Sequence, residues 1–275
     1  KRSCSSLHAP GVVKSITVKP LSQNPSYEVE IFDGSGSLIV IWQGRKHVAG
    51  VEPGTRIEVE GRMPYSSNAT FLVNLTLGDQ VGKGIYKPLR GERPLWDFPS
   101  GLYQREVAAY LLSEAMDLHV IPPTVEREGP FGVGSLQWFI DARFEEHYFT
   151  LYETREDLHD QFRNMAAFDI VANNTDRKGG HCLLDTQQRV WAIDHGVCFA
   201  ADFKLRTVIW EFGGEELPQY LREVIEPLVE SVPLNVSALL NCDEVFALQE
   251  RAQWICEGGA FPIDKTGSRY PWPLV

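Results

Sequence analysis

The stretch that decides the fold spans residues 168–199 and reads FDIVANNTDRKGGHCLLDTQQRVWAIDHGVCF. It begins as an apolar segment at helical spacing and continues into a polar loop that carries Asp176. Two short apolar runs follow, at residues 182–184 and 190–193, and the turn residues between them predict a hairpin. The second run ends at Asp194. The sequence therefore predicts that a hairpin returns two carboxylates, Asp176 and Asp194, to one place.

Two carboxylates in this arrangement suit the transfer of a phosphoryl group from ATP. One carboxylate orients and deprotonates the acceptor hydroxyl, and the other holds the metal ion that bridges the phosphates. Upstream, Lys87 ends a predicted strand and Glu106 lies on the next amphipathic helix, and such a pair can hold a cation over the α- and β-phosphates. A polar turn without glycine is suited to cover phosphates with its N–H and hydroxyl groups, and it consists of Ser66, Ser67 and Asn68.

The rest of the chain divides into a β-rich start and a mixed remainder. Period-two alternation between turns predicts four strands, at residues 12–19, 27–32, 38–42 and 57–61. Helical spacing predicts one helix that follows Arg105 and further helices at residues 158–171, 217–230 and 243–257. Short strands are expected between the helices, among them residues 134–140. The sequence thus predicts a small β-rich module before a larger α+β domain.

The β-rich start resembles OB-fold proteins. The resemblance rests on YEVEIFDGSGSLIVIW at residues 27–42 and on VEPGTRIEVEGR at residues 51–62, and it implies a five-stranded Greek-key barrel. Because four strands precede the next motif, the barrel is expected to be incomplete or to close with a strand at residues 70–77. Such barrels often bind single-stranded nucleic acids through basic and aromatic side chains, which here are Lys14, Lys19, Tyr27, Phe32, Trp42, Arg45 and Lys46. The three aromatic residues are also expected as barrel core, because alternate strand residues point inward.

Three separated motifs resemble the phosphatidylinositol 3- and 4-kinase-like group. They are YKPLRGERPLWDFP with REVAAYLL, FDIVANNTDRKGGHCLL, and AIDHGVCFAADFKLRTVIW. The pattern is most similar to type II phosphatidylinositol 4-kinases and to actinobacterial kinase-like proteins grouped with them. The resemblance covers about residues 62–275. It implies an α+β, bilobal protein-kinase-like fold over residues 63–275, with a small β-rich N-lobe at about 63–135 and a mainly helical C-lobe at about 141–275, after an OB-like segment at residues 1–62.

The resemblance also implies ATP as phosphate donor and a divalent metal ion, Mn²⁺ or Mg²⁺. By position, it makes Lys87 a contact of the ATP phosphates and Glu106 its ion-pair partner. It makes Asp176 the catalytic-loop carboxylate and Asp194 a metal ligand. The remaining predicted nucleotide contacts, for an adenine between the lobes, are Leu136 and Trp138.

One position departs from the family pattern. Five residues beyond Asp176, where kinase-like enzymes usually carry an asparagine that binds the metal, this chain has His181. Magnesium prefers hard oxygen ligands, whereas imidazole suits softer ions such as manganese. We therefore expect His181 and Asp194 as metal ligands and better activity with Mn²⁺ than with Mg²⁺. Asn173 and Asn174 are nearby amides that could replace the missing ligand.

Charge is unevenly distributed along the 275 residues, which carry a net charge of −11. Residues 1–62 contain eight basic and six acidic side chains, and the remainder contains 18 basic and 31 acidic ones, a net of −13. Because the remainder also lacks a polybasic stretch, a protein hydroxyl or a small hydroxylated metabolite fits the charge better than a lipid on an anionic membrane. The acidic total argues against extensive nucleic-acid binding, and leaves weak binding by residues 1–62 as an expectation.

The favoured function is an ATP- and metal-dependent phosphotransferase whose hydroxyl acceptor is a protein, a small molecule or a lipid. One alternative is a nucleotide sensor with weak or no turnover, and another is an OB-fold protein that binds single-stranded nucleic acid beside a kinase-like partner domain. No run approaches the roughly 18 apolar residues of a membrane-spanning helix, no apolar signal core follows the N-terminus, and the five cysteines form no C-x-x-C pair. The sequence thus predicts a cytoplasmic protein with reduced thiols and no integral membrane association.

Overall fold

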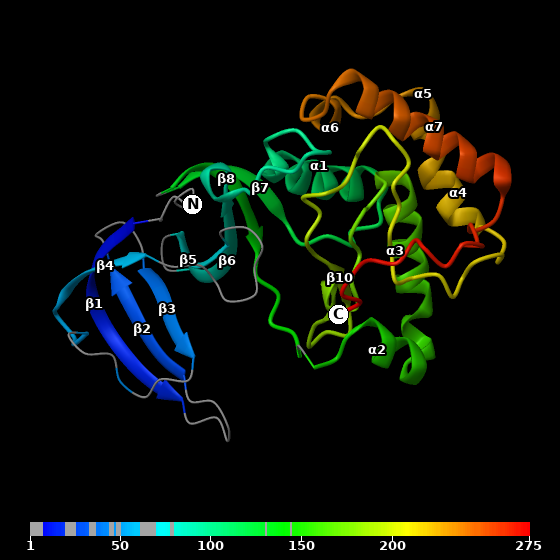
Figure 1. Ribbon diagram of the computed structural model, residues 1–275. Helices are drawn as coiled ribbons and strands as arrows, with labels where there is room; N and C mark the ends of the chain where they lie inside the picture. The colour runs from blue at the N-terminus through cyan, green and yellow to red at the C-terminus, as the bar shows by residue number, and fades with distance from the viewer. Residues whose placement is uncertain are drawn as a thin grey trace. The chain divides into compact units, whose positions relative to one another are not determined.

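The chain forms two compact units (Figure 1). The computed structural model describes residues 8–19, 26–32, 37–43, 47, 51–60, 70–77, 80–129, 131–143 and 145–275. The sheet unit comprises Lys1–Arg93 and Arg127–Phe139, and the helical unit comprises Pro94–Glu126 and Ile140–Val275. The predicted α+β class with a β-rich N-terminal region is confirmed. The predicted N-lobe range 63–135 differs from this division, because residues 94–126 belong to the helical unit.

An eight-stranded sheet in the order β4-β1-β2-β3-β5-β6-β8-β7 dominates the sheet unit. Its strands are β1 His8–Lys19, β2 Ser26–Phe32, β3 Ser37–Gln43, β4 Arg56–Glu60, β5 Phe71–Leu77, β6 Gln80–Pro88, β7 Thr124–Gly129 and β8 Gly132–Trp138. A single 3₁₀ turn, η1 Leu89–Gly91, follows β6. The first four strands occur where the alternation predicted them, with ends that differ by a few residues.

The expected OB-like barrel is not closed in the part of the chain that the structure describes. β1 pairs with both β2 and β4, and β3 pairs with β5 where Leu38 lies opposite Val73. Closure would require β5 to offer its other edge to β4. That edge is occupied, because β5 pairs with β6 along its whole length, from Phe71 to Leu77. The strands therefore continue as one open sheet.

The aromatic residues expected in the barrel core differ in how far they are buried. Tyr27 is buried beside Val13, Val29 and Ile31, and its hydroxyl donates a hydrogen bond to the Val51 carbonyl at 3.1 Å. By contrast, 43% of Phe32 is exposed. The core role is thus confirmed for Tyr27 and wrong for Phe32, whose ring faces water.

The nucleic-acid hypothesis for this module stays a prediction. Lys14, one of its candidate cations, donates to Glu30 at 2.8 Å. Arg45, Lys46 and the side chains of Lys19 and Trp42 lie outside the described residues.

The helical unit contains the longer helices and a small hairpin. Its helices are α1 Leu102–Ala115, α2 Tyr148–Thr154, α3 His159–Ala172, α4 Gln219–Ile225, α5 Pro227–Glu230, α6 Leu234–Ser237 and α7 Cys242–Gly258. Two 3₁₀ turns, η2 Glu156–Leu158 and η3 Gly179–His181, and the strands β9 Cys182–Leu184 and β10 Val190–Ala192 complete it. The predicted helix 217–230 is divided at Pro227, because proline lacks an N–H donor and its ring crowds the preceding turn.

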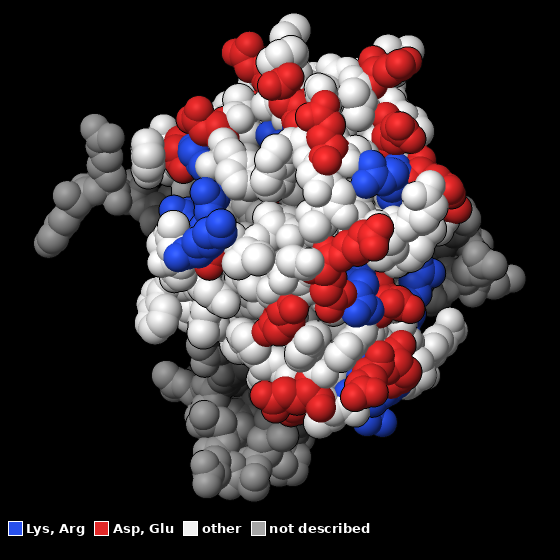
Figure 2. Space-filling view, turned by 90° about the vertical axis from the view of Figure 1, so that its right-hand side faces the viewer, with Lys and Arg blue, Asp and Glu red and all other residues white. Residues whose placement is uncertain are grey.

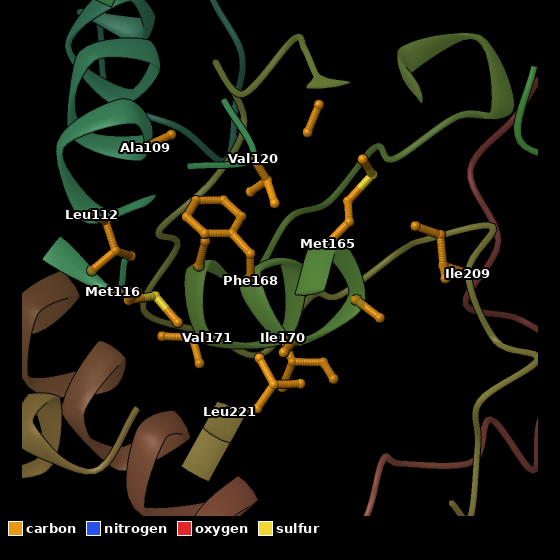
Figure 3. Close-up of a cluster of buried hydrophobic side chains, with 14 of the residues drawn as sticks. Ala109, Leu112, Met116, Val120, Met165, Phe168, Ile170, Val171, Ile209 and Leu221 are labelled. Carbon is orange, nitrogen blue, oxygen red and sulfur yellow. The ribbon is translucent and has the colours of Figure 1, made fainter. Parts of the chain in front are cut away.

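Helix α3 lies at the centre of the helical unit's hydrophobic core. Phe162, Met165 and Phe168 on α3 are completely buried, as is Leu112 on α1. Figure 3 shows Phe168 and Met165 among side chains from α1, from Val120 and from Leu221 on α4. Because α3 is covered on several sides, its C-terminal end is held firmly, and the loop that carries Asp176 begins there. None of the described helices is long and apolar enough to cross a membrane.

Gly134 on β8 provides a test of the packing beside Lys87. A Cβ atom at Gly134 would lie 2.4 Å from the Lys87 carbonyl oxygen and 2.6 Å from the Pro88 Cα atom. Because these are backbone atoms, we expect Gly134→Ala to lower the free energy of unfolding by about 1–3 kcal/mol and to speed amide exchange in β6. Gly258→Ala is the control, since no atom lies within 4 Å of its added Cβ, and it should be neutral or stabilise by up to about 1 kcal/mol. Urea unfolding with hydrogen exchange measures both variants, and equal effects would contradict the close packing.

Candidate functional site

Helix α3 ends in a loop whose asparagines are structural. Asn173 adopts a left-handed backbone conformation, with φ of 51°, which asparagine tolerates and which ends the helix. Its amide donates to the carbonyls of Ala200 and Asp202, each at 2.8 Å. The Asn174 amide donates to Asp169 at 2.9 Å, and its oxygen accepts the Asp176 N–H at 3.0 Å. Both side chains are completely buried and engaged in these structural hydrogen bonds, and the expectation that either replaces the missing metal ligand stays a prediction.

A buried ion pair anchors the loop to α3. The Arg177 guanidinium donates two hydrogen bonds of 2.8 Å to the Asp169 carboxylate, and neither side chain is exposed. The same guanidinium contacts His195 at 2.6 Å and donates to the Ile193 carbonyl at 2.9 Å. Burial opposes the charged form of Arg177, but Asp169 outweighs it and raises the pKa of Arg177, so the guanidinium stays charged. One cation thereby joins α3, the loop and the segment after β10.

The loop also pairs with residues 206–208, and this pairing decides which way its side chains point. Three backbone hydrogen bonds of 2.9 to 3.1 Å connect the two segments, and Arg177 forms a parallel bridge with Thr207. Arg177 and Thr207 are both buried. Because side chains alternate in extended backbone, Asp176 and Arg206 face the opposite, more open side.

Asp176 is partly buried and interacts with Lys178. The Lys178 ammonium donates to the Asp176 carboxylate at 2.7 Å, and their side chains are 20% and 33% exposed. Burial raises the pKa of Asp176 above its usual range, and Lys178 opposes the rise. Asp194 adds to the rise, so the two carboxylates lie near enough for their charges to interact. Lys178 was not among the predicted site residues, although its position two residues after Asp176 in an extended loop puts both side chains on one face.

The predicted hairpin is confirmed, and it brings His181 and Asp194 together. Cys182 on β9 pairs with Ala192 on β10, and this is the pair nearest the open end of the hairpin. His181 and Asp194 lie just beyond it, at that open end. There His181 Nε2 lies 3.5 Å from an Asp194 carboxylate oxygen. Asp194 has a φ of 63°, an unusual backbone conformation that is often found at functional sites, and its side chain is 51% exposed.

The His181–Asp194 pair fits a divalent cation. His181 Nδ1 faces the Lys178 N–H at 3.4 Å, which leaves Nε2 directed at Asp194. An imidazole nitrogen and a carboxylate oxygen are suitable ligands for Mn²⁺. Within the described ranges, no three His, Cys, Asp or Glu side chains converge on a metal site. This chain would thus supply two side-chain ligands and leave other positions for phosphate oxygens and water.

Glu106 supports the backbone beside Asp194. This glutamate on α1 is only 3% exposed, and its carboxylate accepts the His195 N–H at 3.0 Å. Its predicted partner Lys87 belongs to the sheet unit. The Lys87–Glu106 ion pair stays a prediction.

The register of β6 and β8 separates the predicted nucleotide contacts. Lys87 pairs with Ser135, whereas Leu136 pairs with Tyr86 and Trp138 pairs with Gly84. Because neighbouring residues on a strand point to opposite faces, Leu136 and Trp138 lie on the face opposite to Lys87. The sequence alone did not predict this separation. Ser66, Ser67 and Asn68, the predicted phosphate-covering turn, lie outside the described residues.

Removing the charge of Asp169 tests the anchor. Asp169→Asn leaves the buried Arg177 guanidinium without its counter-charge, so we expect the free energy of unfolding to fall by about 3–5 kcal/mol. Asp160→Asn on the same helix is the matched control. Its side chain is 84% exposed and bonds Arg163, so the change should stay within about 0.5 kcal/mol. Denaturant unfolding monitored in the helical unit measures both, and a small effect of Asp169→Asn would refute the anchoring role.

Comparisons with known proteins agree with this geometry. Residues 99–233 match the family described as phosphatidylinositol 3- and 4-kinase, a range that includes α1, α3, the loop and the hairpin. Protein Rv2133c of Mycobacterium tuberculosis (strain ATCC 25618 / H37Rv) is 33% identical, and the similarity covers 79% of this chain and 91% of that protein. The chain therefore belongs to the phosphatidylinositol 3- and 4-kinase family.

Proposed function

We propose that this protein is an ATP- and divalent-metal-dependent phosphotransferase that acts on a hydroxyl acceptor. The observation that carries the proposal is that one buried cation, Arg177, holds both the loop with Asp176 and the backbone before Asp194. Two interacting carboxylates are thus fixed beside an imidazole and an ammonium group. Family membership supports phosphotransferase chemistry, and the motif pattern supports placement near the type II phosphatidylinositol 4-kinases.

Each site residue has a distinct role in the proposed reaction. Asp176 orients the acceptor hydroxyl and takes its proton, and its raised pKa brings it nearer to that of an effective base. Lys178 neutralises Asp176 and lies where it can contact the transferred phosphate. Asp194 and His181 would hold the metal ion, whose positive charge would neutralise the ATP phosphates. Glu106 positions Asp194 through the next residue's backbone.

In the sheet unit we assign the nucleotide-facing side to Lys87 and its same-face neighbours. Ser135 and Gln137 share the face of Lys87 by register, and both are buried. Lys83 also lies on this face, 5.9 Å from the Phe139 ring centroid. These polar groups are better suited to bind a nucleotide than Leu136 and Trp138, which face the other way.

The acceptor is proposed to carry a negative charge close to its hydroxyl. Arg206 is exposed on the same side of the paired segments as Asp176, and Lys204 lies two residues before it. Lys204 is held by Asp97, at 3.3 Å, and by the Trp96 ring, at 5.7 Å. Although acidic side chains are spread over much of the face in Figure 2, the Lys178 ammonium is bonded to Asp176. Local charge therefore outweighs the net charge of the chain as a guide to the acceptor, and anionic acceptors, lipids included, fit the site.

The decisive test is metal-dependent release or transfer of the ATP γ-phosphate by the purified protein. We expect Asp176→Asn and Asp194→Asn each to lower the rate at least about 100-fold, because each removes a reacting or metal-binding carboxylate. Asp202→Asn, at an exposed carboxylate four residues before Arg206, should retain activity. The folded state raises the pKa of Asp176. Ionised Asp176 therefore lowers the free energy of unfolding near neutral pH, and this destabilisation disappears below the pKa of the carboxyl in the unfolded chain, near 4. Asp176→Asn should therefore keep or raise the melting temperature at pH 7, which separates lost chemistry from unfolding.

The alternative, a nucleotide sensor, gives a different result in the same experiment. A sensor would show ATP- and metal-dependent thermal stabilisation of the wild type without γ-phosphate release. That outcome, with a panel of lipid, protein and small-molecule acceptors present, would refute the proposed phosphotransferase activity.

Metal preference tests the role of His181. We expect the wild type to work faster with Mn²⁺ than with Mg²⁺ at saturation, because imidazole is the softer ligand. His181→Asn supplies an amide oxygen instead and should shift the Mn²⁺/Mg²⁺ rate ratio at least about fivefold towards Mg²⁺. His159→Asn on α3, away from Asp194, is the control and should leave the ratio unchanged. Equal rates with the two metals in the wild type would show that His181 is not a ligand.

A further inference from the structure

The segment 269–275 reaches the loop between Lys178 and His181. The Gly179 N–H donates a hydrogen bond of 2.7 Å to the Leu274 carbonyl. A Cβ atom at Gly179 would lie 3.3 Å from a Val275 methyl group, and one at Gly180 would lie 3.7 Å from the other methyl. In Figure 1 the C-terminus is marked beside β10, in agreement with these contacts. Residues 274 and 275 therefore pack directly against the two glycines.

These glycines separate two residues of the proposed site. Lys178, which bonds Asp176, precedes them, and His181, which lies beside Asp194, follows them. Two successive glycines have more conformational freedom than any other dipeptide, so their backbone needs outside contacts to hold one geometry. A Cβ atom added at Gly179 would lie 3.2 Å from the Phe149 ring and 3.3 Å from Val275. The glycines are thus held between α2 and the segment 269–275.

The same segment also holds the strand that pairs with the loop. The Arg269 carbonyl accepts the Thr207 N–H at 3.1 Å and the Trp210 indole N–H at 3.2 Å. Thr207 is the residue that bridges to Arg177. Pro271, between the two contact points, is buried. One short segment therefore touches both sides of the paired backbone that presents Asp176.

We propose that the segment 269–275 is a positioning element of the active site, which fixes Lys178 and His181 through Gly179 and Gly180. This inference rests on the proposed function, which assigns Lys178 and His181 their roles in the active site. The segment has no helix or strand of its own, and Trp272 and Val275 are 87% and 56% exposed. Such segments open at low free-energy cost. Release of the segment would then loosen the site without unfolding the core.

Hydrogen exchange tests this positioning role without relying on turnover. We compare the full chain with a variant that lacks residues 270–275 and with Val275→Asp, which keeps the backbone but places a charge against the glycines. Both variants should speed exchange in residues 178–181 at least about tenfold, while the α3 core peptide keeps its protection. Trp272→Ser is the control, because that ring is 87% exposed, and it should exchange like the wild type. Unchanged protection of residues 178–181 in both variants would overturn the proposal, as would equal loosening of α3.

Metal dependence of ATP turnover supplies a second readout. In both variants the Mn²⁺ concentration that gives half the maximal rate should rise about fivefold or more, because His181 is no longer held beside Asp194. A fall in rate with an unchanged Mn²⁺ requirement would mean that the segment only stabilises the fold and would overturn the positioning role. Absence of turnover in the wild type would refute the proposed function itself, and the exchange result distinguishes the two failures.

Discussion

The buried ion pair of Arg177 and Asp169 is the interaction on which the site depends. A guanidinium without exposed surface must bond its surroundings almost completely, and Arg177 does so through the Asp169 carboxylate, the His195 ring and the Ile193 carbonyl. These partners come from two segments, helix α3 and residues 193–195 after β10. The attraction between the two buried charges adds little net stability, because burial of the charges costs free energy. The role of the pair is to fix one relative placement of α3, the loop and the end of the hairpin.

This placement explains why an acidic chain can present a basic site. Arg177 points inward and is neutralised by Asp169, so its alternate neighbours Asp176 and Lys178 point outward. The segment 206–208 that pairs with the loop adds Arg206, which alternation places on the same side. The chain as a whole carries a net charge of −11, and acidic side chains are spread over much of the face in Figure 2. Net charge describes solubility and long-range attraction, whereas the proposed acceptor would meet only the few side chains around Asp176.

The sequence predicted those features that depend on local pattern. The hairpin at residues 182–193, the long helices and the strands around Tyr27 follow from spacing and turn residues, and the motif with Asp176 and Asp194 led directly to the family. Barrel closure was not predictable, because it depends on which partner β5 takes over its whole length. The opposite facing of Lys87 and Leu136 required the register of β6 and β8. Lys178 was missed because a lysine in a polar loop has no distinctive pattern until its partner is known.

The residues that perform the proposed chemistry are held mainly by residues that perform none. Asp194 has a left-handed backbone that a non-glycine residue adopts at some cost, and the neighbouring His195 N–H is fixed by Glu106. Gly179 is fixed by a carbonyl from the segment 269–275, and Asp176 by the Asn174 amide. Precise placement of reacting groups is worth several orders of magnitude in rate. Mutations that remove these supporting contacts are therefore expected to impair the proposed activity as much as mutations of the carboxylates. If Asp176 and Asp194 act together as proposed, the backbone contacts of the loop are what hold the two carboxylates in place.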